Sequence, residues 1–279
     1  MYKLGLIGYP LGHSISAVIQ KAGFESIGES GTYEILETPP DNLIDRVKYL
    51  KINEYDGFNV TIPLKVPISL FLDEIDETAN IAGCANTVKI LPDRSFKGYN
   101  TDIYGFWAAL PKGVSLKDKV AGIIGTGGAS RAATVGLIQA GIKEINYFSR
   151  NIINSAEMIN SMRELFPEIK FNSYQIQMIR DLSDLAILVN TTPVGMRGNS
   201  MDQSLISKYD IENMNENAIV YDVIYNPTKT LLLKYAEERG LKIVNGLDML
   251  IHQGAKALEI WTGKKPDVQT MKIAALQAL

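Results

Sequence analysis

Residues 120–141 read VAGIIGTGGASRAATVGLIQAG and predict a strand, a glycine-rich turn and a helix in succession. The apolar run at 120–124 is typical of a buried strand, and the apolar spacing over 129–140 is helical, with Gly141 as the stop. Glycines at such a turn let the backbone approach an anion, which the exposed N–H groups of the helix N-terminus attract. Tight turns also use glycine for purely structural reasons, and the spacing here is not the plain GxGxxG. In its strand context the turn is predicted to hold a dinucleotide pyrophosphate through Gly125, Thr126, Gly127, Gly128 and Ala129.

The end of the next strand indicates which dinucleotide the turn would hold. A strand is expected at 144–149, followed by Arg150 and Asn151, and no Asp or Glu stands at that tip. An acid there would accept hydrogen bonds from the ribose 2′-hydroxyl of NAD. An arginine instead suits the 2′-phosphate of NADP, because its planar guanidinium binds two phosphate oxygens at once. A solvated loop arginine is the ordinary alternative, but joined to the missing acid Arg150 favours NADP as the cofactor.

Short apolar runs alternate with segments of helical periodicity along the chain, which is typical of α/β proteins with parallel strands. Further strands are expected at 3–7, 32–37, 57–60, 87–91, 169–172, 186–190 and 218–223. Further helices are expected at 15–28, 41–51, 156–165, 228–240, 246–263 and near the C-terminus. The sequence therefore predicts an α/β fold of two lobes, one over residues 1–104 completed by the helices of 244–279, and a second over 105–243.

The composition excludes several classes of protein. Of the 279 residues, 46% are hydrophobic and 21% are charged, so the chain can build a core and is not disordered. Lys and Arg number 28 against 31 Asp and Glu, which leaves no basic surplus for a nucleic-acid partner. One cysteine, Cys84, and two histidines predict neither an internal disulfide nor a metal site. No apolar run approaches the ~18 residues of a membrane span and no signal peptide is evident, so a cytoplasmic protein is expected, as a monomer or a homodimer.

Neutral polar residues follow several apolar strands of the first lobe, where open α/β sheets place their ligands. They fall in four short segments, at 13–16, 59–65, 84–87 and 98–102. With one lysine and one aspartate among them, they suit a small polyhydroxylated monoanion better than a phosphate or an apolar ligand. Residues of these types also form turns and helix caps, and Ser14 stands where the cap of the first helix is expected.

Lys65 and Asp102 are the candidate acid–base pair among these residues. The reduction of a ketone by a nicotinamide requires a proton donor beside the developing alkoxide. The chain offers only two histidines, His13 and His252, so a lysine is a reasonable donor. A neighbouring carboxylate would orient the ammonium and stabilise its charge. Both residue types are usually solvated surface groups, so the hypothesis depends on the segments around them.

These segments together resemble the shikimate dehydrogenase family. The motifs stand in the family's order along nearly the whole chain: GHSIS at 12–16, NVTIPLK at 59–65, GCANT at 83–87, NTD at 100–102, the glycine turn, NTTPVGM at 190–196, YDVIYNP at 221–227 and GLDML at 246–250, continuing to Gln253. The resemblance implies a substrate-binding domain in the first lobe and a Rossmann-like NADP-binding domain in the second. The implied reaction is the reversible NADPH-dependent reduction of 3-dehydroshikimate to shikimate, in the shikimate pathway of aromatic amino acid biosynthesis.

The resemblance also implies roles for individual residues. Ser14 and Ser16 would hold the substrate carboxylate, with Tyr225 nearby, and Lys65 paired with Asp102 would be the acid–base group. The ring hydroxyls would be bound by Asn59, Thr61, Asn86, Asp102 and Gln253. The cofactor would be held, besides the glycine turn, by Arg150, Ile224 and Gly246.

The chain departs from the family pattern at Ala17, Ile103, Thr126 and Asn151, and no second arginine stands within 151–157. The expected preference for NADP therefore depends on one arginine. Two alternatives stay open: a quinate/shikimate dehydrogenase that uses NAD or NADP, and a dinucleotide-binding sensor without catalysis. A sensor would have no use for an acid–base pair, which favours an enzyme.

Overall fold

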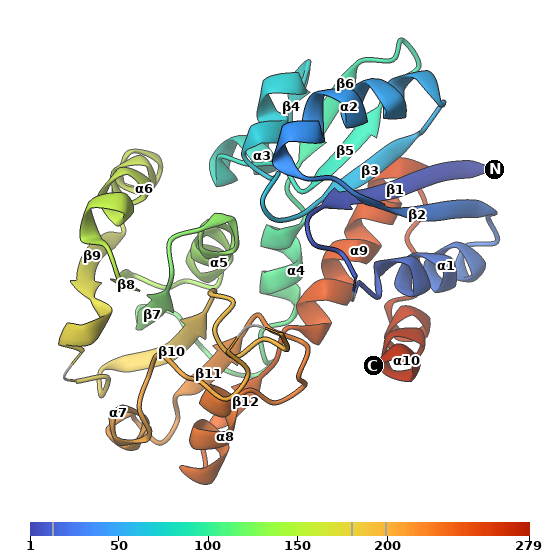
Figure 1. Cartoon of the computed structure of the whole chain (residues 1–279). Helices are drawn as coiled ribbons and strands as arrows, with labels where there is room; N and C mark the ends of the chain where they lie inside the picture. The colour runs from blue at the N-terminus through green and yellow to red at the C-terminus, as the bar shows by residue number, and fades with distance from the viewer. Residues whose placement is uncertain (13, 180, 199) are drawn as a thin grey trace. The chain divides into compact units, whose positions relative to one another are not determined.

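The structure, a computed structural model, describes residues 1–12, 14–179, 181–198 and 200–279. The chain forms two compact units, Met1–Gly105 with Ile251–Leu279, and Phe106–Leu250 (Figure 1). Each unit contains a six-stranded sheet with helices, so the expected α/β architecture is confirmed. The division differs from the expected one at residues 244–250, which belong to the second unit. Val244 there pairs with Tyr221 of the neighbouring strand, and this pairing holds the segment to the second sheet.

The first unit is built on a mixed sheet with the strand order β2-β1-β3-β5-β6-β4. Its strands are β1 (Tyr2–Gly8), β2 (Gly31–Glu37), β3 (Gly57–Val60), β4 (Glu74–Ile75), β5 (Thr87–Ile90) and β6 (Phe96–Tyr99). β1 runs parallel to β2 and β3, but β5 runs antiparallel to both β3 and β6. The expectation of parallel strands alone is wrong for this sheet, because the short turn at 91–95 sends the chain straight back as β6.

Helices cover both faces of the first sheet. They are α1 (Ser16–Ser26), α2 (Leu43–Ile52), α3 (Glu77–Ala82), α4 (Asp102–Ala108), α9 (Leu247–Thr262) and α10 (Val268–Ala278), with 3-10 turns η1 (Pro40–Asn42) and η2 (Pro67–Phe71); α4 and α9 each contain a point of division between the units. Leu4 of β1 packs with Phe24 of α1 and Leu258 of α9. Ile7, three residues along the same strand, packs instead with Leu50 of α2. Side chains an odd number of positions apart point to opposite faces of a strand, so β1 is buried on both.

The second unit has an entirely parallel sheet with the order β12-β11-β10-β7-β8-β9. The strands are β7 (Val120–Ile124), β8 (Glu144–Ser149), β9 (Lys170–Gln175), β10 (Leu185–Asn190), β11 (Ile219–Asp222) and β12 (Lys242–Val244). The helices are α5 (Gly128–Gln139), α6 (Ile152–Leu165), α7 (Lys208–Glu212) and α8 (Leu231–Glu238), with the 3-10 turn η3 (Ile176–Met178). This strand order is that of the doubly wound dinucleotide-binding fold, which confirms the expected Rossmann-like architecture.

Two hydrophobic clusters sandwich the second sheet. Ile123 and Val189 contribute to the cluster that contains residues of α5 and α6. Their chain neighbours Ile124 and Leu188 contribute to the cluster that contains residues of α7 and α8. Figure 1 shows α5 and α6 on one face of this sheet and α7 and α8 on the other. The strand order reverses between β7 and β10, and ligands of such sheets bind at the carboxyl ends of the strands beside that point.

Within the described ranges, no helix combines the length and apolar character that crossing a membrane requires. The same residues contain no group of three or more His, Cys, Asp and Glu side chains that could hold a metal ion.

Candidate active site

Lys65 and Asp102 lie against one another in the first unit. Lys65 is in the turn after β3, and Asp102 is the first residue of α4. The Lys65 Nζ donates a hydrogen bond to Asp102 Oδ2 at 2.5 Å. The two side chains are 18% and 9% exposed, so the ion pair is largely withdrawn from water but still open to a small ligand.

The surroundings of the pair favour a charged lysine. Burial alone would lower the pKa of Lys65, because an ammonium loses its hydration there. The charge and the hydrogen bond of Asp102, with a smaller contribution from Cys84, together outweigh burial, so the pKa of Lys65 lies above its ordinary value. At neutral pH Lys65 is therefore an ammonium, a group that can donate a proton.

Buried amides and hydroxyls form a network next to this pair. Asn86 Oδ1 accepts hydrogen bonds from the Thr101 N–H at 2.8 Å and from the Thr87 hydroxyl at 3.0 Å. Asn86 Nδ2 donates to Thr101 Oγ1 at 3.1 Å and to Gln253 Oε1 at 3.4 Å. Thr101 is directly followed by Asp102 in the chain. The structure therefore brings the expected ring-binding residues Asn86 and Gln253 together beside the acid–base pair.

The side chain of Asn59 is occupied by the protein itself. Its Nδ2 donates to the Asn86 carbonyl at 3.1 Å and to Thr87 Oγ1 at 2.9 Å. Its Oδ1 accepts the Tyr33 hydroxyl at 2.7 Å. Both amide hydrogens are spent, so Asn59 has none left to donate to a ring hydroxyl and can only accept. Its main contribution is to fix the strands β3 and β5 beside the network.

Ser14 and Ser16 stand together at the start of α1. The Ser14 hydroxyl donates to Ser16 Oγ at 3.1 Å and accepts the Ser16 N–H at 3.3 Å. Ser14 is not the helix cap that the sequence predicts, because the N-cap position is Ile15 and no side chain caps this helix. The hydroxyl of Thr61, partly exposed after β3, makes no hydrogen bond to another described residue. His13 of the GHSIS segment lies outside the described residues.

The glycine turn of the second unit fits a pyrophosphate group. Gly125 has a φ of +103°, and a Cβ there would lie 2.8 Å from Thr191 Oγ1, so a side chain is excluded on both counts. A Cβ on Gly127 would meet nothing within 4 Å, which leaves the backbone open to a ligand. α5 begins at Gly128, and the first N–H groups of a helix have no carbonyl of their own helix to bond. Open backbone and free N–H groups at one helix end form an anion cradle.

Arg150 follows β8 and is exposed. Its guanidinium forms no hydrogen bond or ion pair with the part of the chain that the structure describes, so it is available to a ligand. Asn151 is the N-cap of α6, where its Oδ1 accepts the Ile153 N–H at 2.9 Å. The amide of Asn151 is thus used in part by the helix, and Arg150 remains the charged group at this strand end.

Three further predicted residues lie beyond β11 in the second unit. Ile224 is 5% exposed, and Tyr225 is half-buried, which raises the pKa of its hydroxyl. Gly246 donates its N–H to the Ile224 carbonyl at 2.9 Å. A Cβ on Gly246 would lie 1.9 Å from the Val223 carbonyl oxygen, so glycine is required there by the backbone packing alone.

Asp222 is a buried carboxylate that the sequence analysis missed. Its Oδ1 accepts from Asn190 Nδ2 and the Ile224 N–H, each at 3.1 Å, and its Oδ2 accepts the Thr230 hydroxyl at 2.7 Å. Burial raises the pKa of Asp222 to about 6, and the three hydrogen bonds limit that rise. Asn190 and Asp222 pair in register at the ends of β10 and β11. Polar residues at the ends of adjacent apolar strands, the signal used for the first lobe, would have found both.

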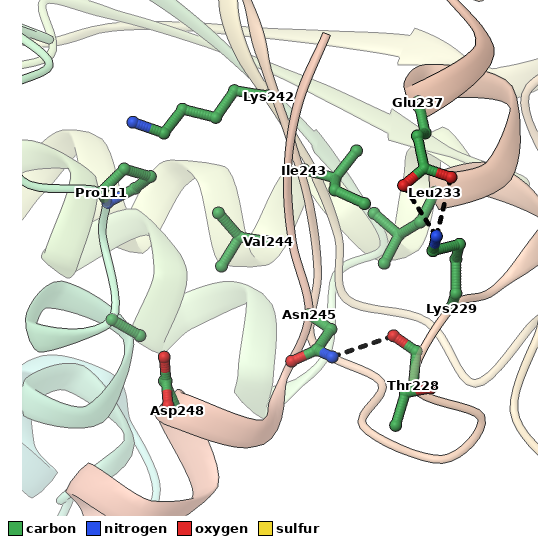
Figure 2. A pocket seen from close by; sticks show the side chains of 11 residues that line it. Pro111, Thr228, Lys229, Leu233, Glu237, Lys242, Ile243, Val244, Asn245 and Asp248 are labelled. Carbon is green, nitrogen blue, oxygen red and sulfur yellow. Dashed lines mark hydrogen bonds and ion pairs between the residues drawn. The ribbon is translucent and has the colours of Figure 1, made fainter. Parts of the chain in front are cut away.

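A cavity of about 580 Å³ lies within the second unit along β12. Its lining, drawn in Figure 2, contains none of the predicted site residues. Lys229 and Glu237 on its wall form an ion pair at 2.7 Å, and Asn245 Nδ2 donates to the Thr228 carbonyl at 2.9 Å. These polar groups of the wall bond one another, and no acid–base pair faces the cavity.

Two family models match this chain. Residues 6–88 match the model of the shikimate dehydrogenase substrate binding domain. Residues 246–276 match the model of the shikimate 5′-dehydrogenase C-terminal domain. The first match contains Lys65 and the Ser14–Ser16 segment, and the second contains Gln253.

Whole proteins of the same kind align with nearly the full chain. A shikimate dehydrogenase (NADP(+)) of Methanococcus maripaludis is 40% identical over 276 residues, which are 97% of this chain and 95% of the relative. A solved shikimate dehydrogenase in complex with NADP+ superposes with a TM-score of 0.90 at 36% identity, over 99% of this chain and 95% of that one. The shikimate 5-dehydrogenase of Thermus thermophilus, in complex with NADP(H) and shikimate, gives 0.87 at 32% identity, over 100% of both chains.

Proposed function

Because this chain belongs to the shikimate dehydrogenase family, we propose that it catalyses the reversible reduction of 3-dehydroshikimate to shikimate with NADPH. The observation that carries the proposal is the ion pair of Lys65 and Asp102, held at 2.5 Å in the first unit. A protein that only senses a dinucleotide has no need of a largely buried lysine and carboxylate in contact. The pair therefore favours an enzyme.

Lys65 is the proton donor when the ketone is reduced. The NADPH supplies the hydride when it is bound. The Lys65 ammonium donates a hydrogen bond to the carbonyl oxygen and gives its proton to that oxygen as negative charge develops there. Asp102 holds the ammonium in place and stabilises its charge. In the reverse direction the neutral lysine accepts the hydroxyl proton of shikimate.

The neighbouring polar groups recognise the rest of the substrate. The paired hydroxyls of Ser14 and Ser16 hold the carboxylate, a role that needs hydrogen-bond donors near a helix N-terminus. Asn86, Gln253 and the hydroxyl of Thr61 bind the ring hydroxyls. Asn59 supports Asn86 from behind. Tyr225, from the second unit, is a further hydrogen-bond donor to the carboxylate.

NADP is the cofactor that the second unit would take. The glycine turn and the first turn of α5 hold its pyrophosphate, and the free guanidinium of Arg150 holds its 2′-phosphate. Ile224 and Gly246 line the nicotinamide end. We place the enzyme in the cytoplasm, since its single cysteine, Cys84, is a free buried thiol that forms no disulfide.

An absorbance assay at the nicotinamide band tests this function. Shikimate and quinate are each offered with NADP and with NAD, and cofactor reduction is followed with time. Turnover that is fastest with shikimate and NADP is expected. Faster turnover of quinate would replace the proposal by a quinate/shikimate dehydrogenase, and reduction of neither cofactor by either acid would refute it.

A further inference from the structure

We propose that Asn100 is a positioning residue, which sets the contact between Asp102 and Lys65 without touching the substrate. Asn100 is 2% exposed. Its Oδ1 accepts the Asp102 N–H at 3.1 Å, and its Nδ2 donates to the Cys84 carbonyl at 3.0 Å. The side chain of Asn100 thus connects the start of α4 with the segment before β5. This inference rests on the function proposed above.

The same segment holds the backbone of Lys65. The Ala85 N–H donates to the Lys65 carbonyl at 3.1 Å. Cys84 and Ala85 are adjacent, so one short stretch of chain is bonded to the lysine by its N–H and to Asn100 by its carbonyl. Asn100 in turn holds the backbone of the aspartate. The two charged residues, 37 positions apart, are placed through this one connection.

Asn100 is itself fixed, which makes it a support rather than a mobile linker. Its own N–H donates to the Thr78 hydroxyl at 2.9 Å. Thr78 in turn is held by Asp76, which caps α3 and accepts the Thr78 hydroxyl at 2.7 Å. Asn100 therefore has partners on three sides, and no part of its amide is left to face a ligand. Its role must act through Asp102.

Loss of this side chain has a defined electrostatic consequence. In Asn100→Ala the Asp102 N–H and the Cys84 carbonyl lose their partner, and α4 is free to shift at its first residue. Among the described residues, the titratable groups that act on Lys65 are the carboxylate of Asp102 and the thiol of Cys84. A longer distance to Asp102 weakens the attraction, while the burial of Lys65 persists. The pKa of Lys65 therefore falls in the variant, and the ammonium is lost at lower pH.

The test measures this titration directly. The Nζ signal of Lys65 is followed by NMR against pH in protein labelled with ¹⁵N-lysine and is assigned by its absence in Lys65→Met. In Asn100→Ala the pKa of Lys65 is expected to fall by about one unit or more, since burial then dominates. The kcat of shikimate oxidation is expected to fall roughly 10- to 100-fold at neutral pH with a KM within about threefold, as for a misplaced catalytic group.

Two further variants keep the result interpretable. Asn100→Ser retains an oxygen that can accept the Asp102 N–H and should recover part of both effects, and it replaces Asn100→Ala should that variant not fold. Val47→Ala removes a buried core methyl pair on α2, away from the pair, and matches the loss of stability. It should leave the Lys65 titration unchanged.

The proposal is overturned if Asn100→Ala or Asn100→Ser titrates at Lys65 like the wild type while losing stability as Val47→Ala does. The NMR titration needs no substrate. An inactive wild type would therefore refute the proposed function while the titration still decided the role of Asn100.

Discussion

Replacement of Lys65 by alanine removes the proton donor and leaves its partner in place. The Asp102 carboxylate is 9% exposed in the pair and would stay largely buried without a cation. Breaking a buried ion pair costs about 3–5 kcal/mol, and the remaining exposure of both groups places this one near the lower end. The variant should fold with a lower melting temperature. Its catalytic loss should be much larger, since a positioned proton donor contributes about 10²–10⁴-fold to the rate.

The loss should appear in kcat rather than in binding. Lys65 interacts most strongly with an oxygen on which charge develops, so kcat and kcat/KM should fall together by about 10²–10⁴-fold. The KM for shikimate should change by less than about tenfold, because the serines and amides that recognise the substrate remain. Initial rates with saturating NADP over a range of shikimate concentrations measure both constants, at a temperature where the variant is folded.

A matched lysine controls for the loss of a buried hydrogen bond. Lys89, on β5 of the same unit, is partly buried and donates to the Ile260 carbonyl at 2.7 Å. Lys89→Ala should cost stability and leave kcat within about twofold of wild type. A Lys65→Ala enzyme with a near-normal kcat would remove Lys65 from the mechanism. Equal losses in Lys89→Ala and Lys65→Ala would show that both act only through folding.

Three further predictions concern the second unit. Arg150→Ala should raise the KM for NADP and leave that for NAD nearly unchanged, abolishing a preference for NADP of about 1.4–2.8 kcal/mol, or one to two powers of ten; equal losses with both cofactors would make Arg150 structural. The pKa of Asp222 is raised to about 6, so the folded protein binds this proton more tightly than the unfolded chain and loses stability as pH rises from about 4 to about 6. Asp222→Asn should flatten that part of the melting-temperature profile, and an unchanged slope would contradict the raised pKa. Gly246→Ala should destabilise the unit by about 3 kcal/mol or more, because its Cβ would overlap the Val223 carbonyl oxygen; a normal melting temperature would show that the backbone can move.

The parallel sheet of the second unit was the most predictable part of the fold. Strands that are covered by helices on both faces read as continuous apolar runs, and the expected ranges 120–124 and 144–149 coincide with β7 and β8. The glycines at 125 and 141 mark the turns because both adopt a positive φ. Here the local sequence and the tertiary environment require the same residues.

Short elements escaped prediction because their own sequence does not determine them. α3 has six residues and α4 has seven, too few to show a helical period. β12 has three residues and reads as a connection to the following helix, although it pairs with β11. Pairing with a strand far along the chain, rather than local periodicity, makes this segment a strand. The misplaced boundary at 244 between the two units follows from that one omission.

The candidate site shows the same contrast between charged and neutral residues. The polar segments of the first lobe contain one lysine and one aspartate, so their pairing could be inferred from the sequence alone. The asparagines at 59, 86 and 100 stand in similar positions after strands, and nothing in their neighbours distinguishes them. Their hydrogen bonds do: Asn59 spends its amide hydrogens on β5 and its neighbour, Asn86 reaches Gln253, and Asn100 holds Asp102. An amide that donates and accepts can satisfy itself in many ways, so its role is decided by the strand across the sheet, whereas a buried charge accepts few partners and therefore identifies its own.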